Sequence, residues 1–173
     1  IVVLALSMTL PPFISQNVGA LQIKRVKRAY SITLKFVLIW QFIVFVAMWG
    51  LSGGIAQAFA HEAEVGSLIQ LFLMIVPLGD GMQGVIVLTN SSLNAMHRPM
   101  TALVLSVIRL FVFFVPISVL GSYLYGLQGL FVGNVIANVA MAGVSLLVFK
   151  RAVAQAVTKE HANLVDANPV SSK

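Results

Sequence analysis

The chain has 173 residues, of which 59% are hydrophobic and only 9% are charged. Soluble domains carry about 25% charged residues, so this composition and a mean hydropathy of +0.97 indicate an integral membrane protein. The formal net charge is +6, but the basic residues cluster between apolar runs instead of covering a polar surface. That distribution argues against nucleic-acid binding.

The first apolar run, Ile1–Val18, has the composition of the end of a membrane span, which Pro11 and Pro12 are expected to kink or break. The chain begins inside this run and without Met, so we expect a fragment of a longer protein. A spanning helix needs about 20 mostly apolar residues. The later segments that meet this condition are Ser31–Leu51, Ser67–Thr89 with a polar extension to Met96, Met100–Leu120 and Gly129–Phe149.

The expected fold is all-α, a polytopic transmembrane helix bundle with about four complete spans plus the end of a fifth. Residues 1–151 would form this bundle, and the polar residues 152–173 would form a disordered cytoplasmic tail. Lys and Arg gather at 24–28 and after 149 and Arg98 lies beside His97 in the loop between, whereas the alternate loops 52–66 and 121–128 contain neither Lys nor Arg. Cytoplasmic loops carry the excess of Lys and Arg, which predicts a cytoplasmic C-terminus, and we expect a bacterial inner membrane. The 24–28 cluster is compatible with contacts to anionic membrane lipid.

Asp80 lies inside an apolar stretch, where a carboxylate costs roughly 2.5–3.5 kcal/mol on insertion scales. At helical spacing it shares a face with other, mostly polar, residues. They are Gln83, Gly84, Val87, Asn90, Ser91 and Asn94. Such a stripe must face protein or water. It is either the wall of a pathway for a polar or cationic ligand or a polar seam packed against another helix. We favour the pathway for Asp80, with Na⁺ as its possible metal, and the packed seam for Asn90, Ser91 and Asn94.

Pro77 and the glycines at 79, 81 and 84 bracket Asp80. They predict either a kinked or locally unwound helix or close helix packing, and both interpretations stay open. Arg109 is the other charge deep in a span. Its direct pairing with Asp80 is less expected than extension towards the membrane surface, or bonding to the Asn90 amide or a freed carbonyl.

The last span carries small residues at every fourth position, Gly129, Gly133 and Ala137, which predicts close contact with another helix. Asn134 and Asn138 lie beside this ridge, and Gln41 lies in the middle of an earlier span. We expect these amides to form interhelical hydrogen bonds, with pathway lining as the alternative.

Enzyme signatures are missing from the sequence. The run His61–Glu64 lacks the second His of a zinc-binding helix, there is no Cys, and no phosphate-binding loop ends in Lys followed by Ser or Thr. We therefore expect no enzyme and no cofactor.

Several motifs together resemble the multidrug and toxic compound extrusion (MATE) family over roughly residues 1–150. They are Pro11–Ala20, Arg25–Tyr30, Ile75–Gly84 running into Asn94–Pro99, and Gly126–Gly133. The resemblance implies twelve helices in two six-helix lobes, of which this chain would supply the end of the eighth and the ninth to twelfth. Sodium-coupled relatives use an acid on the tenth helix, which implies that role for Asp80 or, in a shifted alignment, that position for Gln83.

The hypothesis that follows is part of an antiporter that exports drugs or organic cations against Na⁺ or H⁺ and needs the missing N-terminal lobe of the same polypeptide. The alternatives are a lipid-linked oligosaccharide flippase of the same superfamily and a non-transporting membrane scaffold subunit. The pathway residues expected are Asp80, Gln83, Asn90, Asn94 and Arg109, with Gln41, Asn134 and Asn138 as further candidates.

Overall fold

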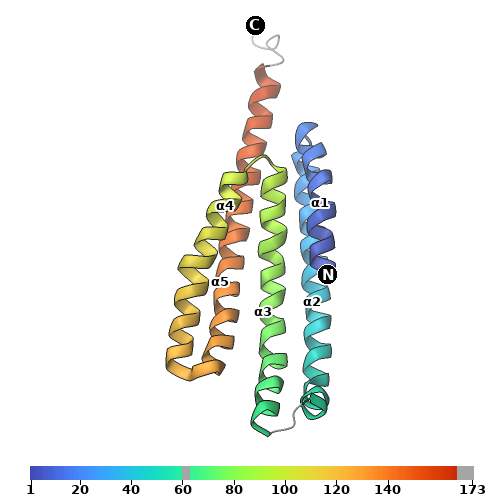
Figure 1. Ribbon diagram of the computed structural model, residues 1–173. Coiled ribbons are helices and arrows are strands. Elements are labelled where there is room, and N and C mark those ends of the chain that lie inside the picture. The colour runs from blue at the N-terminus through green and yellow to red at the C-terminus, as the bar shows by residue number, and fades with distance from the viewer. Residues whose placement is uncertain (60–62, 167–173) are drawn as a thin grey trace.

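The computed structural model describes residues 1–59 and 63–166 (Figure 1). Its elements are α1 (Val2–Gly19), α2 (Ile23–Phe59), α3 (Ala63–Ala95), α4 (Pro99–Ile108), the π-helix η1 (Arg109–Phe114) and α5 (Val115–Asp166). Long helices lie lengthwise beside one another as a bundle, and the described residues contain no strand. Four helical stretches within the described ranges are long and apolar enough to cross a membrane, so the expected all-α transmembrane bundle is confirmed.

The helix α1 continues from Val2 to Gly19 through Pro11 and Pro12, so of the kink or break expected there the break is not observed. The φ angle that a proline ring fixes is compatible with a helix, so the helix can continue although the two prolines lack N–H groups. After the short turn at 20–22, α2 starts ahead of the predicted span and takes the basic cluster into its first turns. Ile23, Val26 and Tyr30 are buried there while the lysines and arginines between them are exposed, the pattern of an amphipathic helix.

The central helix is α3, which contacts α1, α2, α4 and α5. Its stretch 85–93 contributes Val85, Ile86, Leu88 and Leu93 to the buried core. Beside them, the Thr89 hydroxyl lies 2.7 Å from the Tyr30 hydroxyl of α2 in a buried hydrogen bond. The Tyr30 ring stacks on Phe149 of α5 with ring centroids 3.7 Å apart. We call these three side chains the Tyr30 seam, because they join α2, α3 and α5.

The predicted span 100–120 contains a π-helical stretch, η1, between α4 and α5. The N–H of Val115 bonds to the carbonyl of Leu110, five residues earlier. Pro116 follows directly, and a proline crowds the carbonyl four residues before it. The wider π turn leaves room between the Val112 carbonyl and the ring of Pro116.

The helix α5 folds back on itself at Tyr125 and Gly126, so the two predicted spans form a hairpin with a tighter turn than the expected loop 121–128. Gly126 has φ +59°, a conformation that glycine adopts without strain. The two arms touch backbone to backbone: a Cβ on Gly129 would overlap the Gly121 carbonyl, and one on Gly133 would lie 2.9 Å from the Ile117 carbonyl oxygen. The predicted close helix contact at this ridge is confirmed for these two glycines.

The second arm of α5 continues to Asp166, so the disorder expected from residue 152 is wrong for residues 152–166. Ala152 and Val153 are buried against the core, and the Arg98 guanidinium in the α3–α4 turn donates to the Gln155 side chain. The burial of these two side chains and the hydrogen bond to Gln155 stabilise the helix beyond the expected span. The rest of the predicted tail, 167–173, and the loop residues 60–62 lie outside the described residues.

Candidate functional site

The three basic segments lie at one end of the bundle. The α1–α2 turn, the α3–α4 turn and the C-terminal part of α5 meet there, while the α5 hairpin turn lies at the opposite end (Figure 1). Each segment comes from a different part of the sequence, so their shared location agrees with the alternation of charged and uncharged loops. Asp80 lies on α3 between these two ends.

The Asp80 side chain is exposed. No hydrogen bond or ion pair joins it to any other residue of the described chain. A bare carboxylate against hydrocarbon would be too costly. This face of α3 must therefore meet water, a cation or further protein.

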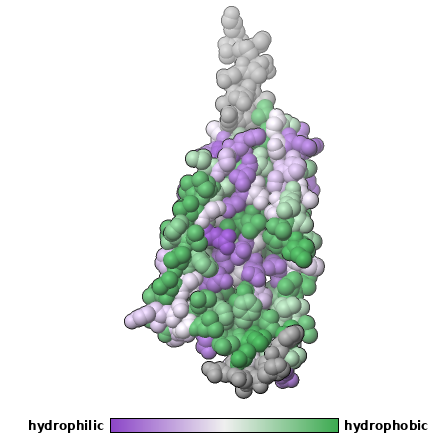
Figure 2. All heavy atoms as spheres, in the orientation of Figure 1, coloured by the Kyte–Doolittle hydropathy of each residue, from purple (hydrophilic) through white to green (hydrophobic). Residues whose placement is uncertain are grey.

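Polar residues continue from Asp80 along the same face of α3. Gln83 is half-buried and Asn94 is exposed, and one helical face carries all three residues. Figure 2 shows hydrophilic residues gathered along the middle of the bundle in the orientation of Figure 1, with hydrophobic residues on both sides. We call Asp80, Gln83 and Asn94 the polar face.

The amide of Asn90 turns aside from the polar face towards α4. Its Nδ2 donates to the Ser106 Oγ at 3.1 Å, and Ser106 in turn donates to the Ala102 carbonyl at 3.0 Å. The Asn90 Oδ1 is buried without a partner among the described residues. A groove of about 410 Å³ runs past Asn90, Asn94 and Ser106 between the two helices. Sequence reasoning missed Ser106, whose one signal was its place one turn before Arg109.

The glycines around Asp80 face neighbouring helices. A Cβ on Gly79 would lie 3.2 Å from a methyl of Val135 in α5, one on Gly81 would lie 3.3 Å from the Gln41 Cβ, and one on Gly84 would lie 3.1 Å from a methyl of Val37. The helix itself is uninterrupted from Ala63 to Ala95. Close packing is therefore the role these glycines have, and the local unwinding considered from the sequence is not observed.

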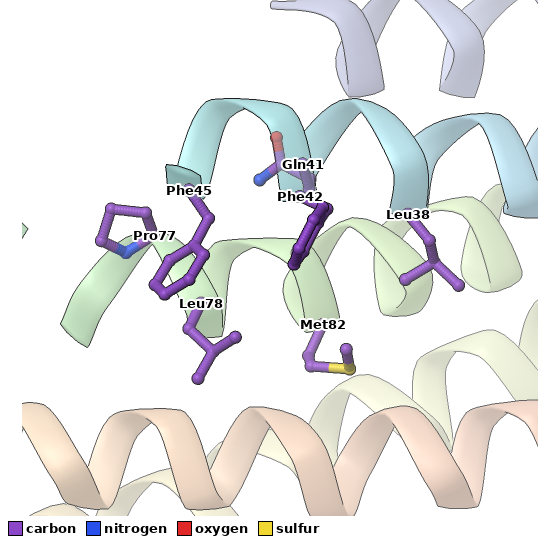
Figure 3. A pocket seen from close by; sticks show the side chains of 8 residues that line it. Leu38, Gln41, Phe42, Phe45, Pro77, Leu78 and Met82 are labelled. Atoms are coloured by element: carbon purple, nitrogen blue, oxygen red, sulfur yellow. The ribbon is translucent and has the colours of Figure 1, made fainter. Parts of the chain in front are cut away.

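On the opposite side of α3 from Asp80, the contact with α2 is apolar. Leu78 and Met82 are each two residues from Asp80, which places them across the helix. A cavity of about 80 Å³ lies there, and Figure 3 shows Phe42 and Phe45 of α2 reaching over it towards α3. Gln41 also lines this cavity. The polar face therefore occupies one side of a helix whose other side is hydrophobic.

Asn138 is buried on the α5 side of Gly79, with its Nδ2 3.6 Å from the place a Cβ on that glycine would occupy. The same Nδ2 donates to the Asn134 Oδ1 at 3.1 Å. This hydrogen bond lies within α5, so the structure pairs the two amides with each other and not between helices. They lie next to the helical turn that carries Asp80.

No group of three or more acidic, His or Cys side chains that could hold a metal ion occurs among the described residues. Asp80 is the one acid of the sequence between residues 65 and 159. Any cation at this carboxylate would need its other oxygen ligands from amides, carbonyls or water. Gln83 is the amide on the same face one turn away.

Arg109 is the first residue of η1 and is half-buried. Within the described chain it has no hydrogen bond or ion pair, so the pairing with Asp80 that we had considered is not formed. The bond to the Asn90 amide considered as an alternative is not formed either, because the Asn90 Oδ1, the atom that would accept from a guanidinium, has no partner among the described residues. The two membrane-embedded charges are thus separate.

Comparison with known proteins decides which family has this architecture. A family model described as MatE matches residues 1–120. The chain belongs to the MATE family. MATE proteins are membrane transporters and not enzymes, so the family match and the missing enzyme signatures agree.

Individual MATE relatives agree with this match. A FAD transporter of Shewanella oneidensis is 36% identical over 141 residues, which are 82% of this chain and 31% of that protein. The Vibrio cholerae MATE transporter VcmN in its bent form is 32% identical with a TM-score of 0.83, over 89% of this chain and 35% of VcmN. An inward-facing multidrug resistance MATE transporter is 16% identical with a TM-score of 0.81, over 89% of this chain and 36% of that protein, and supports the fold alone.

The chain spans about a third of the length of these MATE relatives. An exposed carboxylate in a membrane helix needs a polar partner, and no described residue bonds to Asp80.

Proposed function

We propose that the intact protein exports organic compounds across a membrane in exchange for Na⁺ or H⁺, and that Asp80 takes up the coupling cation. The observation that carries this proposal is the lone carboxylate on the polar face, exposed and without a partner in the described chain. Membership of the MATE family supports transport. We further propose that the end with the basic segments faces the cytoplasm of a bacterial inner membrane, following the Lys and Arg distribution.

The chemistry of the site follows from its charge. A proton or Na⁺ on Asp80 neutralises the carboxylate and lowers the cost of placing it in a low-dielectric environment. When the carboxylate is free, it attracts a cationic substrate instead, so that the two cations compete for one group. The Gln83 amide is close enough along the helix to offer an oxygen to a metal or to a substrate. One lobe cannot enclose such a pathway, so we propose that the N-terminal lobe of the same polypeptide forms the opposite wall.

The test uses the full-length protein in proteoliposomes with an imposed Na⁺ or H⁺ gradient. Asp80→Asn keeps the size of the side chain and removes its charge, and it should strongly reduce gradient-driven efflux of a cationic dye such as ethidium. Asp166→Asn makes the same chemical change at the end of α5 and serves as the matched control. Unchanged efflux with an unchanged ion requirement in the Asp80 variant would refute the proposal.

A second candidate substrate is FAD, which is favoured by the identity of 36% to the FAD transporter of Shewanella oneidensis. FAD carries a diphosphate and would be repelled by a free carboxylate, so its anionic part would bind nearer to Arg109. Measuring the uptake of FAD and of ethidium into the same inverted vesicles shows which of the two compounds is transported. Competition between FAD and ethidium, with both dependent on Asp80, would indicate a pathway that accepts both.

A further inference from the structure

A separate groove lies at the basic end of the bundle, between α2 and α5. It has a volume of about 710 Å³. Its floor is part of the Tyr30 seam, where the buried rings of Tyr30 and Phe149 stack. The two stacked rings therefore line the groove and join its two walls at this level.

The charge of this groove is positive. Lys27 of α2 and Lys150 of α5 line it from opposite sides, and both side chains are exposed. A neighbouring depression of about 390 Å³ shares Lys27 and adds Lys24, Arg28 and Lys35. No acidic residue lines either of these two surfaces. Together they favour an anionic group bound between the helices.

The groove changes from basic to apolar along the helices. Leu34 follows Lys27 by seven residues, or about 10 Å at the rise of an α-helix, and it lines the groove on the α2 side. Leu146 lines the groove on the α5 side, one turn from Lys150 towards the middle of the span. A ligand that fits would have an anionic head at the membrane surface and an apolar tail pointing into the bilayer.

We propose that this groove is a binding site for an anionic phospholipid. The lipid phosphate would lie between Lys27 and Lys150, and the first part of an acyl chain would pass between Leu34 and Leu146. Basic pockets between transmembrane helices at the membrane surface are suited to such headgroups. The proposal is independent of Asp80 and of the transported substrate, because none of the groove residues belongs to the polar face.

The experiment measures lipid retained by the full-length protein. Protein purified from nanodiscs of phosphatidylcholine with a minor fraction of phosphatidylglycerol is analysed by native mass spectrometry. The Lys27→Gln, Lys150→Gln double variant should bind phosphatidylglycerol about tenfold more weakly. The control is Arg25→Gln, Arg151→Gln, which removes the same charge from the same two helices at positions that line neither basic surface and should change binding less than about twofold.

A third variant tests the shape of the groove without changing its charge. Ala154 is exposed and lines the groove, so Ala154→Trp should fill the space and displace the bound phospholipid. Excess soluble glycerophosphoglycerol should leave the lipid bound, because it lacks the acyl chain. The proposal is overturned if the unaltered protein retains no phosphatidylglycerol, if the lysine and arginine variants lose it equally, or if the soluble headgroup displaces it.

Discussion

Two stretches of α3 contact their neighbours in different ways. Over residues 85–93 the helix is fixed by side chains, with Ile86 and Leu88 fully buried and Thr89 bonded to Tyr30. Over residues 77–84 the close contacts to other helices are made by glycines, while Asp80 is exposed. The anchoring contacts and the proposed cation site thus lie in different stretches of one helix of this MATE protein. Substitutions in the first stretch should change stability, and those at Asp80 should change transport.

The largest expected effect is on transport by the Asp80→Asn variant. Loss of the carboxylate removes the proposed cation-binding group, and gradient-driven efflux in proteoliposomes should fall at least about tenfold. The thermal unfolding midpoint of the purified protein should stay the same or rise, because a costly charge has been removed. A large fall in that midpoint would show that Asp80 anchors the fold, and the distinction between the two stretches would fail.

The next effect is expected at Gly81, where a Cβ would lie 3.3 Å from the Gln41 Cβ of α2. Gly81→Leu would press against the Gln41 Cβ, and overpacking of this kind typically costs about 1–3 kcal/mol. Gly143→Leu is the matched control, since nothing lies within 4 Å of a Cβ at that position. The free energy of unfolding in mixed micelles measures both variants. Equal values for the two would mean that the glycine contact has no structural role.

Within the Tyr30 seam, Thr89→Val removes the buried hydrogen bond and leaves the Tyr30 hydroxyl without a partner. The expected loss of stability is about 1–3 kcal/mol. Thr33→Val is the control, because the Thr33 hydroxyl bonds to the Ala29 carbonyl of its own helix. The double variant Tyr30→Phe, Thr89→Val should lose less than the sum of the single losses. Strictly additive losses in a double-mutant cycle would argue that the two hydroxyls do not interact.

The smallest effect on stability is expected at Asn90, which lies in the buried stretch of α3 but bonds to α4. Asn90→Leu removes the hydrogen bond to Ser106 and also the buried Oδ1 that lacks a partner in the described chain. The gain and the loss should nearly cancel, with a change in unfolding free energy below about 0.5 kcal/mol. Ser106→Ala leaves the whole amide in place and should cost more. The opposite order in thermal unfolding would show that the Oδ1 has a partner in the intact protein.

The order of the helices could be predicted from the sequence because bilayer thickness and the Lys and Arg distribution act on the chain one segment at a time. The predicted ends of the helices were less accurate than their order. Hydropathy marks where residues meet lipid, and α5 continues past that point to Asp166. The contact of Gly121 with Gly129 and the π turn before Pro116 depend on neighbours in space or on local crowding, so they were not foreseen in detail.

In the candidate site, too, some features could be predicted from the sequence and others could not. Helical periodicity alone placed Asp80, Gln83 and Asn94 on one face, because it needs only the rise and turn of a single helix. It could not show that Asn90 bonds to Ser106 or that Asn138 bonds to Asn134. Those pairings depend on the relative register of helices and on side-chain rotamers. The assignment of the coupling cation to Asp80 stays a prediction.

The glycine hairpin of α5 has a consequence for how this part of the transporter can move. The backbone of Gly129 meets that of Gly121, and Gly133 lies against Ile117, so no side chain separates the two arms at these contacts. Packed backbones do not slide past one another easily, and we expect the paired arms to shift as one rigid body. Bending would then be confined to the π turn above the hairpin, where Arg109 begins η1, so a membrane charge would change its depth whenever the hairpin tilts.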